Sequence, residues 1–112
     1  MARKILRGGI YWANLEPTIG SEQQGTRPVV VVSIDAFNQN GQTAIAFAIT
    51  SKKPRVTYPL VYKLPEDLLP KQSWIKISQI RTLSSQRLGR QIAQIEEEDL
   101  SKIMAGFNRL CN

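Results

Sequence analysis

The sequence contains no histidine and only one cysteine, Cys111, which lies next to the last residue. The commonest general base is therefore missing, and the cysteine has no imidazole to activate it as a nucleophile. Because the usual His and Cys metal spacings are missing too, we expect no bound metal and no cofactor. A single cysteine makes no internal disulfide, which predicts a reducing, cytoplasmic location.

Long apolar runs and phosphate-binding loops are also missing. Apolar runs such as residues 29–32 are far too short to span a bilayer, and residues 1–7 lack the apolar stretch of a signal peptide. Gly8-Gly9 is a turn pair rather than a glycine-rich nucleotide loop. Acids are sparse before residue 96. The chemistry that remains is what arginine, threonine, serine, glutamine and one glutamate can perform.

The 112 residues carry 15 Lys and Arg against 9 Asp and Glu, a net charge of +6. Residues 1–90 hold thirteen basic and five acidic residues, hence +8, whereas residues 91–112 carry −2. A hydrophobic content of 42% and this length predict one folded domain over residues 1–112. The basic body could attract a polyanion, although many small proteins are basic for solubility alone.

Most of the chain alternates short β-branched segments with turn residues. We expect strands over residues 10–12, 27–33, 43–50, 57–63 and 73–83, and a last one through residues 92–95. Residues 16–26 form a polar loop, Asn38-Gln39-Asn40-Gly41 indicates a hairpin, and residues 65–70 and 84–88 are turns.

The segment 43–50 alternates large and small side chains. The large ones are Ile45, Phe47 and Ile49, and the small ones are Ala44, Ala46 and Ala48. The small face predicts close packing by a helix or a second subunit. After residue 99 the apolar residues recur at helical spacing, and they are Leu100, Ile103, Met104, Phe107 and Leu110. Four acids at 96–99 suit the start of that helix. The architecture is a small curled antiparallel barrel or sheet closed by a C-terminal helix.

Cleavage of RNA by transesterification suits this residue set, because the ribose 2′-OH supplies the nucleophile. The protein then needs to fix the geometry and to stabilise charge on the phosphate. Arg27 ends the polar loop before Pro28, and Thr50-Ser51 end the strand that a hairpin would bring back beside it. On pattern alone, Arg27 as a structural ion-pair residue and Thr50-Ser51 as a plain strand end remain open.

Three blocks of sequence resemble the MazF/PemK/Kid family of toxins. They are Arg7-Gly8-Gly9-Ile10-Tyr11-Trp12, Gly20-Ser21-Glu22-Gln23 with Gly25-Thr26-Arg27-Pro28, and Gln79-Ile80-Arg81-Thr82-Leu83. The resemblance covers nearly the whole chain in order. It implies a mainly β (α+β) fold, a small SH3-like antiparallel β-barrel with a C-terminal α-helix, assembled as a homodimer. It also implies a sequence-specific endoribonuclease that cuts single-stranded RNA and leaves 2′,3′-cyclic phosphate and 5′-hydroxyl ends.

The resemblance assigns roles to particular positions. Arg27 and Thr50 match the family's catalytic pair, and Glu22 and Gln23 lie in the matching substrate loop. Ser51 lies beside the catalytic threonine, and Gln79 matches a position facing the RNA groove. The general base stays open between Glu22, Thr50 and a group on the substrate.

This chain also departs from the family pattern. Gly9 and Asn14 stand where many relatives carry an acid, and Ser84 replaces a frequent aspartate. Some relatives use an alternative catalytic set of an arginine and an aspartate with a histidine. Here those two strand positions hold Lys76 and Ser78, and histidine is missing, which favours the Arg27/Thr50 pair. Two other readings remain, a poison of DNA gyrase of the similar CcdB fold and a catalytically silent binding homologue.

The family implies a second partner besides RNA, a cognate antitoxin whose acidic disordered segment would bind the basic body. Reading unstacked RNA bases would need stacking groups. Tyr58, Trp74 and Phe37 are possible stacking residues, and a core role is an equal alternative for each.

Overall fold

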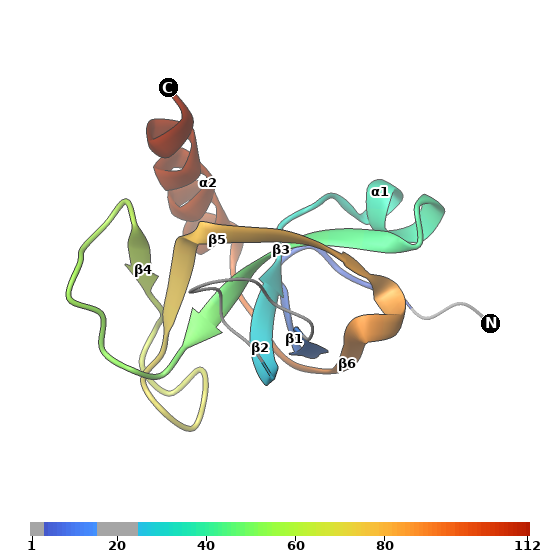
Figure 1. Cartoon of the computed structure of the whole chain (residues 1–112), viewed down its shortest axis with the longest axis horizontal. Helices are drawn as coiled ribbons and strands as arrows, with labels where there is room; N and C mark the ends of the chain where they lie inside the picture. The colour runs from blue at the N-terminus through green and yellow to red at the C-terminus, as the bar shows by residue number, and fades with distance from the viewer. Residues whose placement is uncertain (1–3, 16–24) are drawn as a thin grey trace.

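The computed structural model describes residues 4–15 and 25–112, and within them six strands form one antiparallel sheet (Figure 1). The strands are β1 (Gly9–Asn14), β2 (Thr26–Val31), β3 (Thr43–Thr50), β4 (Val61–Lys63), β5 (Trp74–Ser84) and β6 (Leu88–Gln94). The helices are α1 (Asp35–Asn40) and α2 (Glu97–Cys111), and a 3-10 turn, η1 (Ser85–Arg87), joins β5 to β6.

The sheet has the strand order β4-β5-β3-β2-β1-β6, so β4 and β6 are its edges. Pairing between β4 and β6 would close a barrel, and none occurs among the described strands. Register shifts between β1 and β6 and between β3 and β5 curl the sheet. The prediction of a mainly β, SH3-like antiparallel fold with a C-terminal helix is confirmed, with the sheet curled rather than closed.

Two of the expected elements were wrong in detail. Residues 57–60 form a tight turn, in which Leu60 N donates to Thr57 O at 3.0 Å, so β4 covers only Val61–Lys63 of the predicted strand. The proline at 59 lacks the N–H that a strand would need. The segment predicted as a hairpin is instead helix α1. Asn38 is buried there, and its amide donates to Ile5 O at 3.1 Å and to Ser33 O at 3.0 Å, which favours the helical turn over a hairpin turn. The expected pairing of β2 with β3 is nevertheless present.

The two faces of the sheet pack against different material. Helix α2 covers the face that carries Phe47, whose ring lies 5.5 Å from that of Phe107. The alanine face of β3 was predicted to meet a helix or a second subunit. It is instead filled by the chain's own buried side chains, which are Ile5, Tyr11, Leu15, Val29, Val31, Leu83 and Leu88. The curl of the sheet brings these groups over the small residues.

Helix α2 begins as predicted after Glu96, with Glu97, Glu98 and Asp99 in its first turn. Arg7 ties this end to β1 through an ion pair with Glu97 at 2.8 Å. The adjacent Gly8 has a φ of +87°, and a Cβ there would lie 2.6 Å from Gln94 Nε2. Glycine is therefore required where β1, β6 and α2 meet. No helix in the described ranges is long and apolar enough to cross a membrane.

Candidate active site

Arg27 is the second residue of β2, and its side chain is exposed. It pairs with Ala13 of β1, and Pro28 follows it inside the strand. Among residues 4–15 and 25–112 no carboxylate forms an ion pair with Arg27. The structural ion-pair reading therefore has no support within these ranges, and the guanidinium is available to a phosphate.

Thr50 is the last residue of β3 and is half-buried. Its Oγ1 accepts a hydrogen bond from Lys52 N at 3.1 Å, which orients the hydroxyl at the strand end. Strands β2 and β3 pair Val29 with Ala48. If this register continued two residues beyond its last pair, Arg27 would come opposite Thr50, and residues opposite one another share a face. Arg27 at the start of β2 and Thr50 at the end of β3 therefore lie at the same end of two paired strands.

The row continues across the sheet to its β4 edge. In β5 the residue opposite Thr50 is Trp74, and Trp74 in turn lies opposite Lys63 of β4. Three adjacent strands therefore place a hydroxyl, an indole and an ammonium in one line, and the guanidinium of Arg27 lies at the same end of the neighbouring strand β2. We call Arg27, Thr50, Trp74 and Lys63 the transverse row. Such a line of donors and cations suits an extended polyanion.

The other predicted site residues lie around the row. Ser51 is exposed in the bend that follows Thr50. Gln79 is half-buried in β5, inside the irregularity between the pairs Ala48 with Lys76 and Phe47 with Ile80. Glu22 and Gln23 fall outside the described residues.

The loop after Thr50 is strongly basic. Lys52, Lys53 and Arg55 are all exposed there, and Lys76 lies opposite Ala48, two pairs along from Trp74. These cations give the end of the sheet that holds Arg27 and Thr50 a positive potential. The basic excess of residues 1–90 is thus concentrated, in part, where the predicted site lies.

A second cluster of titratable groups adjoins α2. Tyr62 donates to Asp99 Oδ1 at 2.6 Å, and burial, together with this hydrogen bond, raises the pKa of Tyr62 above its ordinary value. Tyr62 therefore stays protonated at neutral pH and does not serve as a base. Within the described ranges no three His, Cys, Asp or Glu side chains lie close enough to hold a metal ion.

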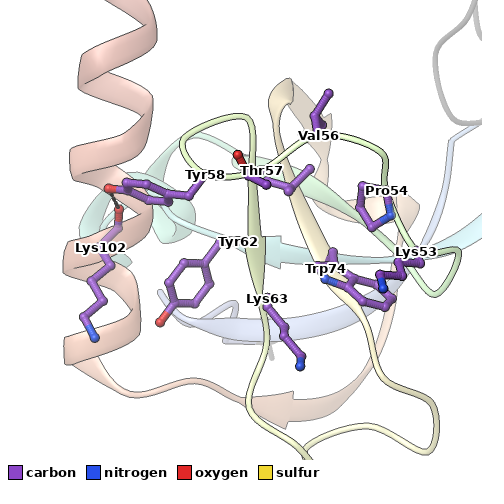
Figure 2. Close-up of a pocket in the computed structure, with 10 residues that line it drawn as sticks. Lys53, Pro54, Val56, Thr57, Tyr58, Tyr62, Lys63, Trp74 and Lys102 are labelled. Carbon is purple, nitrogen blue, oxygen red and sulfur yellow. Dashed lines mark hydrogen bonds between the residues drawn. The ribbon is translucent and has the colours of Figure 1, made fainter.

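Sequence reasoning missed a pocket of about 450 Å³ at the β4 edge. Figure 2 shows it between the arching loop that follows β3, the strand β4 and helix α2. Its lining residues are Lys53, Pro54, Val56, Thr57, Tyr58, Val61, Tyr62, Lys63, Trp74 and Lys102. The pocket was not predicted because residues 57–63 were expected to form a strand, and a strand there leaves no loop to line a pocket. The prolines at 54 and 59 are the signal that indicates a loop there.

Comparison with known proteins is consistent with this geometry. The family model for the PemK-like, MazF-like toxin of type II toxin–antitoxin systems matches residues 6–111. Endoribonuclease EndoA of Bacillus subtilis (strain 168) is 36% identical over 101 residues, which is 88% of this chain and 87% of that protein.

Solved structures share the fold. MazF from Deinococcus radiodurans superposes with a TM-score of 0.86 at 26% identity, covering 98% of both chains. An endoribonuclease from a mycobacterial species, solved in complex with its cognate antitoxin, gives 0.77 at 24% identity over 96% of this chain and 94% of that one. The family match spans almost the whole sequence, and so the chain belongs to the PemK-like, MazF-like toxins of type II toxin–antitoxin systems.

Proposed function

We propose that this toxin is a metal-independent endoribonuclease that cuts single-stranded RNA, with Arg27 and Thr50 acting on one phosphate. The observation that carries the proposal is the antiparallel pairing of β2 with β3, since Arg27 lies near the start of β2 and Thr50 ends β3 at the same end of the pair. The endoribonuclease name of the Bacillus relative, at 36% identity, supports the reaction class.

In the proposed reaction the 2′-oxygen attacks the adjacent phosphorus, and the bond from phosphorus to the 5′-oxygen breaks. The 2′-hydroxyl gives up its proton to a base, and the leaving 5′-oxygen takes one up. The products are a 2′,3′-cyclic phosphate and a 5′-hydroxyl, so no water or metal is consumed. Arg27 stabilises charge on the non-bridging oxygens through paired N–H donors, and the Thr50 hydroxyl orients the same phosphate.

The proton acceptor is one of three groups, which are Glu22, Thr50 and a group on the RNA. Tyr62 is not among them, because it donates to Asp99 and its pKa is raised. Ser51, Gln79, Glu22 and Gln23 are proposed as substrate-binding residues around the transverse row.

Two protein partners follow from membership of the family. One is a cognate antitoxin with an acidic segment that competes for the basic end of the sheet. The other is a second copy of the chain, in a homodimer. The lone, exposed Cys111 is compatible with a reducing cytoplasm as the place of action.

A cleavage assay tests the function. Purified protein is incubated with a long single-stranded transcript in EDTA, and the fragment ends are mapped and their chemistry determined. We expect discrete cuts with cyclic phosphate and 5′-hydroxyl ends, absent with Arg27→Ala. A folded, antitoxin-free protein that cuts none of several transcripts would overturn the proposal, and gyrase inhibition would then be measured.

A further inference from the structure

The pocket at the β4 edge has aromatic and apolar walls with cations among its lining residues. Tyr58, Tyr62 and Trp74 are its aromatic members, and Lys53, Lys63 and Lys102 are its cations. None of its lining residues carries a carboxylate. Lys102 is partly neutralised by Glu98 at 3.4 Å, whereas Lys53 and Lys63 form no ion pair with any carboxylate of the described ranges.

One hydrogen bond and two ring contacts fix the loop that forms one wall of the pocket. Tyr58 anchors the loop to α2, since its hydroxyl donates to Lys102 O at 2.8 Å (Figure 2). Its ring lies so close to Gly106 that a Cβ there would be 3.0 Å from Tyr58 Cε2. The guanidinium of Arg109 lies 5.8 Å from the centre of the same ring. Since these contacts fix the loop before binding, little ordering cost falls on the ligand.

Trp74 belongs both to the pocket and to the transverse row. It lies directly opposite Thr50 on one side and Lys63 on the other. Directly opposed residues have Cβ atoms about 5 Å apart. The pocket wall therefore begins one strand away from the hydroxyl assigned to the scissile phosphate. The base of a nucleotide next to that phosphate is therefore within reach of the pocket.

The lining selects for a ligand that is both flat and anionic. An indole face binds a planar ring by stacking, and ammonium groups bind phosphate as point charges. A purely apolar ligand would leave the lysines unused, and a small inorganic anion would leave the aromatic wall unused. An unstacked nucleotide of single-stranded RNA uses both.

We propose that this pocket binds one nucleobase adjacent to the scissile phosphate, with Trp74 as the stacking platform and Lys53 and Lys63 on its flanking phosphates. The assignment rests on the proposed ribonuclease function and deepens it, because it makes Trp74 a specificity-determining residue. The pocket would then fix the base preference at one position of the cut site, while other contacts read the remaining positions.

The first test compares Trp74→Leu with wild type on one long transcript, with every cut mapped. We expect cleavage to slow on the order of 10- to 100-fold, the effect of losing one stacked base. Base preference should relax at a single position of the site. Trp74→Phe should restore most of both. Trp12→Leu is the control, since Trp12 is 41% exposed on β1 and lies opposite Pro28, away from the pocket.

The second test leaves the fold untouched. Lys53→Gln with Lys63→Gln should weaken cleavage and make the slope of log rate against log salt shallower by about 1.4, or about 0.7 for each lost phosphate contact. Base preference should not change. Lys4→Gln with Arg90→Gln is the matched control, because Lys4 and Arg90 are exposed outside the pocket.

The outcomes separate the two proposals. A wild type that cuts no RNA refutes the ribonuclease function. The pocket is then tested with a random pool of 2′-O-methyl RNA 12-mers, which should quench the fluorescence of Trp74 in a Trp12→Phe background. A wild type that cuts while Trp74→Leu keeps its rate and every base preference refutes the pocket assignment alone. Loss of inhibition by an acidic antitoxin peptide in that variant, with RNA cutting unchanged, would assign the pocket to the antitoxin instead.

Discussion

The middle and the end of the β2–β3 pair differ in burial and in chemistry. In the middle, Val30 and Phe47 are fully buried and lie opposite one another under α2. At the end, three residues away on the same strands, Arg27 is exposed and Thr50 is half-buried. The buried part sets the position of the exposed part, because both belong to the same paired strands. A reactive pair placed on strands is held more firmly than one placed on loops.

The largest effect is expected from a substitution in the buried middle of the β2–β3 pair. Phe47→Ala should lower the free energy of unfolding by about 3–5 kcal/mol, because it removes a large buried ring and its contact with Phe107. Chemical denaturation measures this. RNA cleavage per folded molecule should stay near that of wild type, and a selective loss of turnover in the folded fraction would contradict the separation of the two regions.

The end is tested by Arg27→Ala. Loss of a charged donor to the reacting phosphate should reduce the cleavage rate by about 100- to 1000-fold. Since the side chain is exposed, the midpoint of thermal unfolding should hardly move. A variant that cuts like wild type would refute the role of Arg27, and Arg90→Ala on the edge strand β6, two strands away from β2, is the control.

Two substitutions of Thr50 distinguish the role of its hydroxyl from that of its side-chain shape. Thr50→Val should slow cleavage by about 10- to 100-fold and Thr50→Ser by much less, because only the serine keeps an oxygen to orient the phosphate. Loss of the Lys52 N–H acceptor will also loosen the strand end in the valine variant. Equal rates for the two variants would show that the hydroxyl takes no part.

Much of the site's frame was predictable from the sequence, since local patterns encode it. The β-branched run 29–32 and the alternation over 43–50 predicted β2 and β3, and their pairing sets Arg27 and Thr50 at the same end of the sheet. The pocket was not predictable in this way. It depends on a turn at 57–60 and on the contact of Tyr58 with Gly106, which joins residues 48 positions apart. Strand propensity carries no information about such a contact.

The filling of the alanine face shows a second limit. The small residues on one face of β3 correctly predicted that other groups pack close against it. They did not predict that these groups are the chain's own side chains rather than a helix or a second subunit. Its identity depends on the curl of the sheet, which arises from register shifts such as the one between Phe47 and Ala48 opposite β5. A bulge of this kind is set by the whole ladder rather than by the residues at the shift.

A smaller effect concerns the anchoring of β4 to α2. Tyr62→Phe should cost about 1 kcal/mol near neutral pH by removing the hydrogen bond to Asp99. The pKa of Tyr62 is raised above its ordinary value of about 10, so its contribution is fully present below pH 10 and is lost as the pH rises further. The stability difference between wild type and variant should therefore stay constant below about pH 10 and shrink as the pH rises above it. A constant difference would contradict the buried tyrosine–carboxylate pair.

The smallest effect is expected at the start of α2. Glu97→Gln removes the ion pair with Arg7, whose partners are 26% and 73% exposed, and should cost less than about 1 kcal/mol. The cost should fall further in high salt, which thermal unfolding in two salt concentrations would measure. Cleavage should be unchanged, because this contact lies outside the transverse row.

The central claim is that Arg27 and Thr50 act on the same phosphate, and a double-mutant cycle tests it most directly. Single-turnover cleavage rates are measured in EDTA for wild type, Arg27→Ala, Thr50→Ala and the double variant on one mapped transcript. We predict that the double variant is slowed by far less than the product of the two single effects, as for groups that act as a unit. Effects that multiply fully, or a double variant that cuts like wild type, would contradict the account.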